Sequence, residues 1–156
     1  MAFYSIFMKI DEKDRAIVHE LTQNSKQTTN QLSKKLKIPI TTIHNRIKKL
    51  EREKIILNYT LNLDHNKLGK PVPAYIGISV NYQAGGVGGK ISQTNVAEEI
   101  KKIEGVQEVR IMTGGSDILV KVLARDIPEL NEIVTERLRN VLGVDKTQTS
   151  IVLKEV

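Results

Sequence analysis

The chain has 156 residues, the size of one average domain or of two small ones, and carries 24 lysine and arginine residues against 18 aspartate and glutamate residues. All of the excess positive charge lies in residues 1–63, which hold 12 basic and 6 acidic side chains, whereas residues 64–156 hold 12 of each. This asymmetry predicts a basic module that meets a polyanion, joined to a neutral module with a different task.

The composition excludes several classes of protein. There is no cysteine, which rules out a disulfide scaffold, a zinc finger of the usual type, an iron–sulfur cluster and a thiol nucleophile. No apolar run approaches the roughly 20 residues that span a bilayer, and the opening residues 1–8 are too short and lack the basic start of a secretory signal. We therefore expect a soluble, cytoplasmic protein of ordinary globular composition, with no membrane partner.

Two short helices are predicted at the start of the basic module. Asp11 and Asp14 suit the cap and first turn of the first helix, because carboxylates satisfy unpaired N–H groups at the positive helix end. Its buried stripe consists of Ile10, Ile17, Val18 and Leu21. The second helix opens at Thr28 with Gln31 three residues later, a capping box, and turns Leu32 and Leu36 inward.

A third helix, residues 40–53, carries the strongest functional signal. Ile43, Ile47 and Leu50 recur at i, i+4 and i+7, so they point into a core. Facing away from that stripe, or flanking it, are Thr41, Thr42, Asn45, Arg46, Lys48, Lys49 and Arg52. A helix in the DNA major groove needs this division, since short polar groups near its start reach base edges while cations neutralise phosphates. We predict base reading by Thr41, Thr42 and Asn45, and phosphate contacts by Arg46, Lys48, Lys49 and Arg52.

A cationic helix face is also found on helices that merely face solvent. DNA binding is favoured here by the architecture, because a short helix, a tight turn and a second amphipathic helix form a helix-turn-helix. Residues 55–63 follow with alternating polar and apolar side chains, which predicts a strand and a small wing. The sequence therefore predicts a winged helix-turn-helix over residues 1–63.

These residues resemble the Lrp/AsnC family of leucine-responsive, or feast/famine, transcriptional regulators. The matching stretches are residues 10–17, 30–36 and 46–51, with Ile56, Tyr59, Thr60, Leu63 and the pair Leu68 and Gly69 further on. The likeness covers nearly the whole chain. It implies a sequence-specific DNA-binding regulator that is modulated by an amino acid or a similar small metabolite.

The chain departs from the family pattern at the entry to the third helix. Lys37 stands where the turn often carries glycine, and Pro39 stands where the helix cap is commonly serine. A residue other than glycine costs about 1 kcal/mol at a positive φ, so we expect a turn of different shape here.

Residues 64–73, with Gly69, Pro71 and Pro73, are predicted to form a linker. Beyond it, strands are expected at 74–82, 106–113, 117–124 and 146–154, and helices at 95–103 and 127–142. This order is that of a ferredoxin-like βαββαβ domain over residues 74–156, in which two helices cover one face of an antiparallel sheet. The predicted fold class is α+β.

The uncovered face of that sheet is predicted to be apolar. Strand 117–124 carries large apolar groups on both sides, and Tyr75, Met112 and Val152 are expected on the side of Leu119, Lys121 and Leu123. An exposed apolar face is unusual in a monomer, so we predict a homodimer whose sheets face each other. The family resemblance implies further assembly into tetramers or octamers. Two recognition helices related by a two-fold axis would read a pseudo-palindromic site in double-stranded DNA.

The segment Thr113, Gly114, Gly115, Ser116 and Asp117 resembles the part of the family that lies close to the amino-acid effector. Glycines there free backbone N–H groups to meet a carboxylate, and Asp117 would accept a hydrogen bond from an α-ammonium group. A tight hairpin needs the same residue types, so a purely structural role remains open. The family usually has an aromatic residue where Ser116 stands, and Thr147 and Thr149 match family threonines or reflect ordinary β-propensity.

No enzyme, cofactor or metal site is predicted. The stretch 84–92 resembles a phosphate-binding P-loop, but Ala84 replaces its first glycine and Ile91 its hydroxyl residue, so we interpret it as a flexible inserted loop. His19, His44 and His65 show no metal-ligand spacing, and a structural role is favoured for His44. The open alternatives to a regulator are a weakly specific architectural DNA-binding protein and, less favoured, an amino-acid-binding metabolic enzyme.

Overall fold

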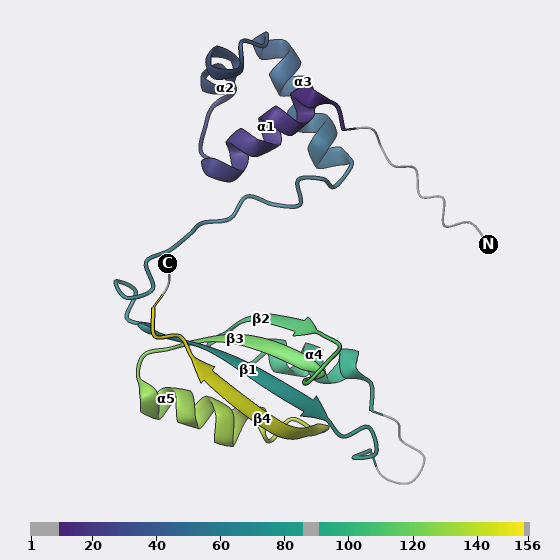
Figure 1. The fold of residues 1–156 in the computed structure, drawn as a ribbon, viewed down its shortest axis with the longest axis vertical. Coiled ribbons are helices and arrows are strands. Elements are labelled where there is room, and N and C mark those ends of the chain that lie inside the picture. The colour runs from purple at the N-terminus through teal and green to yellow at the C-terminus, as the bar shows by residue number, and fades with distance from the viewer. Residues whose placement is uncertain (1–9, 86–90, 155–156) are drawn as a thin grey trace, which may run out of the picture. The chain divides into compact units, whose positions relative to one another are not determined.

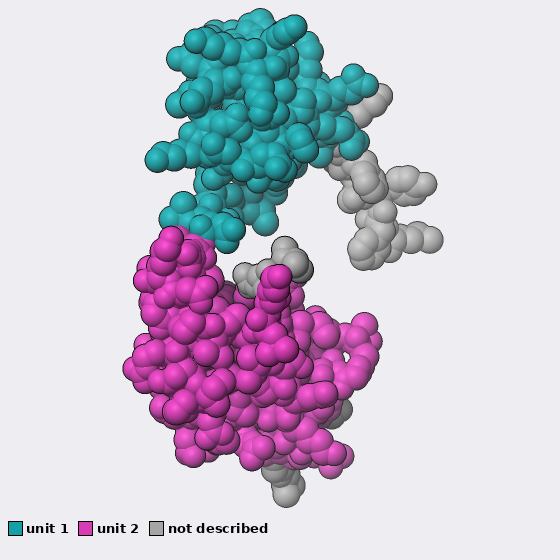
Figure 2. Space-filling model, turned by 60° about the vertical axis from the view of Figure 1, so that its left-hand side comes forward, with its two compact units in different colours: residues 1–62 teal, residues 63–156 magenta. Residues whose placement is uncertain are grey.

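The computed structural model describes residues 10–85 and 91–154 and divides the chain into two compact units, residues 1–62 and 63–156 (Figures 1 and 2). The first unit is helical, and the second holds a four-stranded sheet with helices. Among the described residues, no helix has the length and apolar character that crossing a bilayer requires. Residues 1–8 and most of the predicted loop 84–89 lie outside the described part of the chain.

The helices of the first unit begin where the capping signals place them. They are α1 (Glu12–Gln23), α2 (Thr29–Leu36) and α3 (Ile40–Arg52). The Asp11 carboxylate accepts a hydrogen bond from the Asp14 N–H at 2.8 Å, and the Thr28 hydroxyl accepts one from the Gln31 N–H at 3.2 Å. Both are complete capping boxes, each side-chain cap contributing about 1 kcal/mol to helix stability.

One small core holds the three helices together. Its buried members are Ile17, Leu21, Leu32, Ile38, Ile43 and Leu50. Each side chain of this kind contributes about 1.5 to 3 kcal/mol when fully buried. Val18, Leu36 and Ile47 pack against these residues, so the predicted inner faces are confirmed except for Ile10, which precedes α1 and is not part of this core.

The turn between α2 and α3 keeps a left-handed residue although the residue is lysine. Lys37 has φ 55° and ψ 37°, and the N–H of Ile38 donates to the Ser33 carbonyl at 3.2 Å. The left-handed conformation closes the end of α2 and brings Ile38 into the core, where it is 8% exposed. The expected change in the shape of the turn is thus not found, because burial of Ile38 offsets the cost of about 1 kcal/mol.

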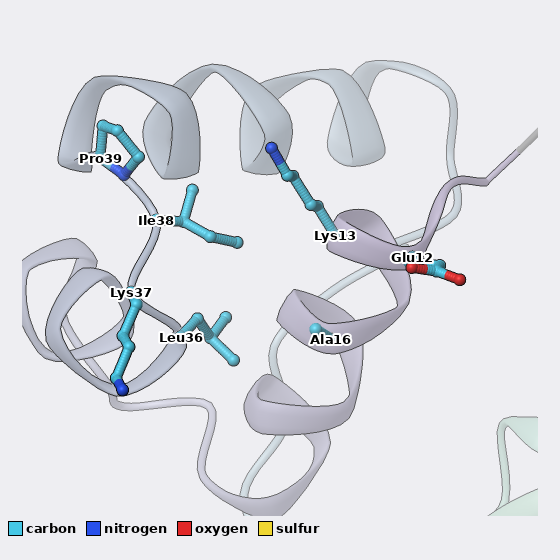
Figure 3. Close-up of a pocket in the computed structure, with 7 residues that line it drawn as sticks. All are labelled: Glu12, Lys13, Ala16, Leu36, Lys37, Ile38 and Pro39. Atoms are coloured by element: carbon cyan, nitrogen blue, oxygen red, sulfur yellow. The ribbon is translucent and has the colours of Figure 1, made fainter.

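A hollow of about 330 Å³ lies between this turn and the start of α1 (Figure 3). It is lined by Glu12, Lys13, Ala16, Leu36, Lys37, Ile38 and Pro39. Two lysines that are far apart in the sequence thus line the same hollow.

The predicted wing strand is wrong. None of residues 55–63, all of which the structure describes, lies in a strand. Ile55 and Ile56 pack against the helical core, whereas Leu57 and Leu61 beyond them are 79% and 81% exposed. A strand forms only where a second segment pairs with its backbone, and no described segment of the chain does so here.

The second unit has the predicted βαββαβ order. Its elements are β1 (Val72–Val80), α4 (Gln93–Lys101), β2 (Val106–Ile111), β3 (Ile118–Ala124), α5 (Ile127–Glu132) and β4 (Val144–Ile151), with a π-helical segment Ile133–Leu138 after α5. The sheet order is β2-β3-β1-β4, and every pairing is antiparallel. The α+β, ferredoxin-like fold class is confirmed.

Several predicted boundaries differ from the structure. β1 begins at Val72, inside the predicted linker, and Lys70 forms a 2.6 Å ion pair with Glu129 of α5. The helix predicted for residues 127–142 is α-helical only as far as Glu132. Ile133 and Leu138 are both fully buried, yet in an α-helix side chains five residues apart point about 140° apart. The wider π-helical turn lets both face the sheet.

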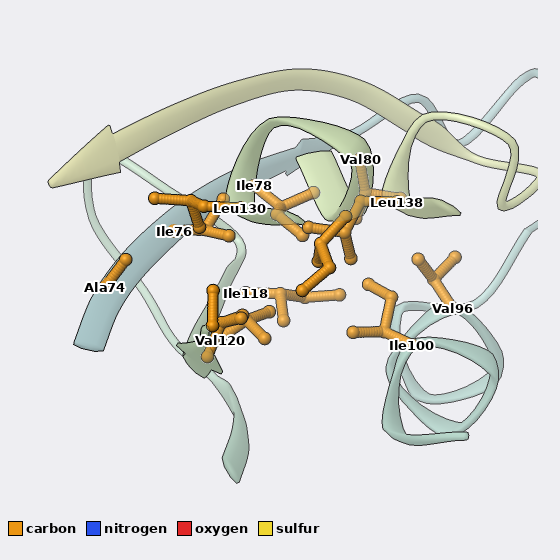
Figure 4. Packing of buried hydrophobic residues seen from close by; sticks show 13 residues of the cluster. Ala74, Ile76, Ile78, Val80, Val96, Ile100, Ile118, Val120, Leu130 and Leu138 are labelled. Carbon is orange, nitrogen blue, oxygen red and sulfur yellow. The ribbon is translucent and has the colours of Figure 1, made fainter. Parts of the chain in front are cut away.

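One face of the sheet carries the core (Figure 4). Ala74, Ile76, Ile78 and Val80 of β1 pack there against Val96 and Ile100 of α4 and against Leu130, Ile133 and Leu138. Lys121 lies opposite Tyr75 on the other face, so Tyr75 shares that face with Leu119 as predicted.

The open face is mixed rather than apolar, which corrects the prediction. Tyr75 and Met112 are each 38% exposed, and the Lys121 amine lies 5.9 Å from the centre of the Tyr75 ring. Glu108 and Arg110 of β2 also lie on this side and pair with each other at 2.9 Å. The open face thus combines apolar groups with charges.

Candidate nucleic-acid interface

The outer surface of α3 gathers the residues that the sequence predicts for base reading. Thr41 and Asn45 are exposed and Thr42 is half-buried, whereas Ile43 and Leu50 on the opposite side are fully buried. His44 is also exposed, which disagrees with a purely structural role for this side chain. Pro39 at the start of α3 provides no side-chain cap, so the first-turn N–H groups have no side-chain partner at that residue.

Arg46 does not stand free on the predicted phosphate-contact face. Its Nη1 atom lies 2.6 Å from Asp11 Oδ2 and 2.7 Å from Asp14 Oδ1, both at the start of α1. The Asp14 side chain is 1% exposed and that of Arg46 is 23% exposed. Arg46 therefore joins α3 to α1 through a buried carboxylate, a contact between residues 32 positions apart.

The charge states of this cluster support the ion pair. The Asp14 N–H and the Arg46 guanidinium lower the pKa of the Asp11 carboxyl. The carboxylates of Asp14 and Asp11 raise the pKa of Arg46. Arg46 and Asp11 are thus both charged at neutral pH, and the pair persists over the physiological range.

The other three predicted phosphate contacts differ among themselves. Lys49 Nζ lies 3.4 Å from Asp14 Oδ2, so this amine also forms an ion pair with α1. Arg52 pairs with its neighbour Glu53 at 3.1 Å, an exposed pair of little energetic weight. Lys48 is exposed and forms no ion pair with any residue that the structure describes. Lys48 and Arg52 are therefore the cations of α3 that can turn to a phosphate at least cost.

The sequence contains a signal for the Asp14 contact that the helix-by-helix interpretation did not use. Asp14 stands at i with Ile17 at i+3 and Leu21 at i+7, so it continues the buried stripe of α1. A carboxylate on a buried stripe needs a cationic partner, because an isolated buried charge is strongly unfavourable. That requirement indicates a partner from another helix without saying which one.

The predicted effector segment lies between β2 and β3. Residues 113–115 are exposed, and Gly114 and Gly115 have open space where a side chain would stand. Ser116 folds over β1 instead, since a Cβ built on Gly77 would lie 2.5 Å from its Oγ. No side chain of the described residues therefore covers the two glycines where a Cβ would stand.

Asp117 is already engaged within the second unit. Its carboxylate accepts hydrogen bonds from the Val80 N–H at 2.8 Å, from the Tyr82 hydroxyl at 2.9 Å and from Gln93 Nε2 at 2.9 Å. These donors, the Val80 N–H first, lower the pKa of Asp117, while burial and the Asp117 carboxylate raise that of Tyr82. Asp117 joins the end of β1 and the start of α4, a structural role that the sequence left open.

The remaining predicted positions carry no clear site. Thr147 is half-buried and Thr149 is exposed on β4, opposite Ile78 and Ile76 of β1. Within residues 10–85 and 91–154, no group of three or more His, Cys, Asp or Glu side chains is placed to hold a metal ion.

Two family models match the two units. The model described as winged helix-turn-helix DNA-binding matches residues 10–56, and the Lrp/AsnC ligand binding domain matches residues 74–156. The first match covers α1, α2 and α3, and the second covers nearly the whole sheet.

Relatives and solved structures agree with both models. The HTH-type transcriptional regulator PF0250 of Pyrococcus furiosus is 40% identical over 142 residues, which span 91% of each chain. AsnC of E. coli superposes with a TM-score of 0.79 at 25% identity, covering 94% of each chain. A transcriptional regulator of Neisseria meningitidis, solved as a complex with L-Met, superposes with a TM-score of 0.85 at 25% identity, covering 95% of this chain and 92% of that one. The chain belongs to the Lrp/AsnC family of helix-turn-helix, DNA-binding transcriptional regulators.

Proposed function

We propose that α3 enters the major groove of double-stranded DNA and reads its sequence. Thr41, Thr42 and Asn45 contact base edges, while Lys48 and Arg52 neutralise phosphates, with Lys49 beside them. The observation that carries this proposal is the exposed face of α3, on which the short polar side chains of Thr41 and Asn45 precede the exposed cations Lys48 and Arg52.

The second unit acts as the dimerisation module in this proposal. Its open face exposes Tyr75 and Met112 beside half-buried Leu119, apolar groups that a second copy of the sheet would cover. The charges on the same face would set the register of two copies. A two-fold dimer presents two copies of α3 to a pseudo-palindromic site, and further assembly to tetramers or octamers follows from the family pattern.

The effector is an amino acid or a similar small metabolite, bound near residues 113–117. The exposed glycine backbone of that segment supports this assignment, and so does the L-Met complex of the structurally similar Neisseria regulator. Asp117 accepts three hydrogen bonds, and a carboxylate offers about four acceptor positions. One acceptor position is therefore left for the α-ammonium group of an amino acid. The protein acts in the cytoplasm, where its DNA lies.

Selection of bound sites from random DNA tests the proposal. The wild-type chain, an Asn45→Ala variant and a control Asn131→Ala variant, which changes an exposed residue of α5, are each used for selection and footprinting. We expect a bounded site for wild type and control, and altered preference at one symmetric pair of base positions for Asn45→Ala. Protection that spreads over any DNA, with no selected motif, would identify a weakly specific architectural protein instead.

The same selection repeated with each amino acid tests the effector. One amino acid is expected to change the affinity for the selected site or the size of the bound assembly. If none of them changes either quantity, the assignment of an amino acid as the effector fails.

A further inference from the structure

We propose that Arg46 is a positioning residue: held by Asp11 and Asp14, its guanidinium sets the rotation of α3 about its own axis and so decides which side chains reach the base edges. This inference rests on the proposed function and replaces the phosphate contact that the sequence predicts for Arg46. The two roles differ in their effect: loss of a positioning residue lowers the preference for one DNA sequence, whereas loss of a phosphate contact weakens binding to all DNA.

The geometry holds Arg46 from two sides. A single nitrogen, Nη1, bridges two carboxylates at 2.6 and 2.7 Å. One of them belongs to Asp14, which is fully buried and has Lys49 Nζ as a more distant cationic neighbour at 3.4 Å. If Arg46 turned to a phosphate, it would leave a buried carboxylate without its closest cation, which is strongly unfavourable.

The apolar contacts of α3 define its rotation less sharply than this ion pair does. Burial of Ile43 and Leu50 is non-directional, so a small rotation keeps both side chains in the core. A rotation of about 20° moves a side chain about 5 to 6 Å from the helix axis by about 2 Å. Such a shift exceeds the tolerance of a hydrogen bond to a base. The directional contacts of Arg46 therefore define the rotation within the limits that base reading requires.

The charges around α3 fit the same division of roles. Asp11 and Asp14 lie on the side of Arg46 and cancel positive charge there. Lys48 lies about 160° round the helix from Arg46 and is free of such partners in the described part of the chain. A phosphate is thus attracted to the Lys48 side and meets carboxylates on the Arg46 side.

Two measurements separate positioning from phosphate contact: the slope of log K against log salt, and the ratio of affinities for the selected site and for random DNA. Lys48→Gln is the matched control, because it removes one cation from the same helix. In a dimer this substitution removes two phosphate contacts, so the magnitude of the negative slope should decrease by about 1.8. Arg46→Gln should leave the slope unchanged and lower the affinity ratio by about a hundredfold, because the dimer loses about tenfold at each of its two half-sites.

Asp14→Asn gives the sharpest contrast. It removes no cation, so a phosphate-binding Arg46 would be freed and all DNA would bind more tightly with the ratio unchanged. A positioning Arg46 loses its buried partner in both copies of α3, so the ratio of affinities for the selected site and for random DNA should fall by about a hundredfold while binding to random DNA is not weakened. Arg46→Lys is the second test, to be used if Asp14→Asn does not fold, because it keeps the positive charge but cannot bridge two carboxylates in the same way. For Arg46→Lys we expect a lower ratio of affinities for the selected site and for random DNA, with an unchanged slope of log K against log salt.

The inference would be overturned if Arg46→Gln made the salt slope shallower by as much as Lys48→Gln does. It would also be overturned if Asp14→Asn or Arg46→Lys left the ratio of affinities for the selected site and for random DNA unchanged. Wild-type protein that binds DNA without preference would overturn the proposed sequence-specific function, and the slopes would still decide whether Arg46 contacts a phosphate. Wild-type protein without salt-dependent affinity for DNA would overturn both.

Discussion

Replacing Asp117 by Asn tests whether this carboxylate holds the second unit together. Asp117 accepts hydrogen bonds from a backbone N–H at the end of β1, from an exposed tyrosine hydroxyl and from the amide of Gln93 at the start of α4. Asn keeps one acceptor oxygen but places an NH₂ group against the remaining donors. The substitution preserves size and removes charge and acceptor capacity.

The expected loss follows from the three contacts. A hydrogen bond to a charged group contributes about 1.5 to 3 kcal/mol net, and the Tyr82 hydroxyl adds little because it can turn to water. The part-buried Val80 N–H and Gln93 amide are then the contacts at stake, and Asn satisfies one of them. We expect Asp117→Asn to lower the free energy of unfolding by about 1 to 3 kcal/mol at pH 7.

The pH dependence has a defined sign. The Val80 N–H and the Tyr82 hydroxyl lower the pKa of Asp117 below its ordinary value of 3.8. The unfolded chain therefore binds the proton at a higher pH than the folded chain does. The stabilisation by Asp117 is fully present above pH 3.8 and is lost as the pH falls through the lower pKa of the folded state. The difference between wild type and Asp117→Asn should shrink accordingly.

Urea unfolding followed by circular dichroism at pH 7, 5 and 3 measures these differences. Asp145→Asn, which changes an exposed carboxylate of β4 in the same unit, is the matched control and should lie within about 0.5 kcal/mol of wild type. The reasoning fails if Asp117→Asn equals the control at pH 7, or if its deficit is as large at pH 3 as at pH 7.

Three further substitutions test other parts of the structure. Asn45→Ala should cost about 1 to 3 kcal/mol at one base position in binding assays on single-base operator variants, and uniform weakening across all of them would contradict the groove assignment. Gly105→Ala should destabilise the second unit by about 2 to 4 kcal/mol in urea unfolding, because φ is +92° and the new Cβ would lie 2.9 Å from Ile133 Cδ1 and 3.3 Å from a backbone oxygen. Adding Ile133→Val, which removes that Cδ1 atom, should restore only part of the loss, so complete recovery would refute the backbone contribution. Leu119→Lys on the open sheet face should shift sedimentation toward the monomer, whereas Glu98→Lys on α4 should not; equal sedimentation of the two variants would contradict dimerisation through this face.

Much of the architecture follows from signals within a few residues of each other. The cap at Asp11, the capping box at Thr28 and the periodicity of Ile43 and Leu50 predict helices that the structure contains. The apolar residues of 117–124 likewise predict a strand, which the structure contains as β3. These signals are local because a helix satisfies its own backbone, and because a strand in a half-covered sheet alternates in burial.

Other features depend on partners far away in the sequence. The wing predicted for residues 55–63 has the alternation of a strand, but no described segment pairs with it, so the pattern alone could not form one. The π-helical segment after α5 is set by how Ile133 and Leu138 meet the sheet. Local periodicity carries no information about either contact.

The sequence by itself determined the three helices of the first unit, the βαββαβ order of the second, the concentration of positive charge in the first unit and the face of α3 that meets solvent. Only the tertiary structure decided the roles of individual side chains on those faces. Arg46 is one of several cations along the sequence, and it becomes a link between helices because Asp14 is buried 32 residues away. Asp117 is one residue of a hairpin until β1, the turn after it and α4 each bring one donor to it. The reason is that solvation and Coulomb energy depend on distance in space, whereas sequence patterns report only distance along the chain.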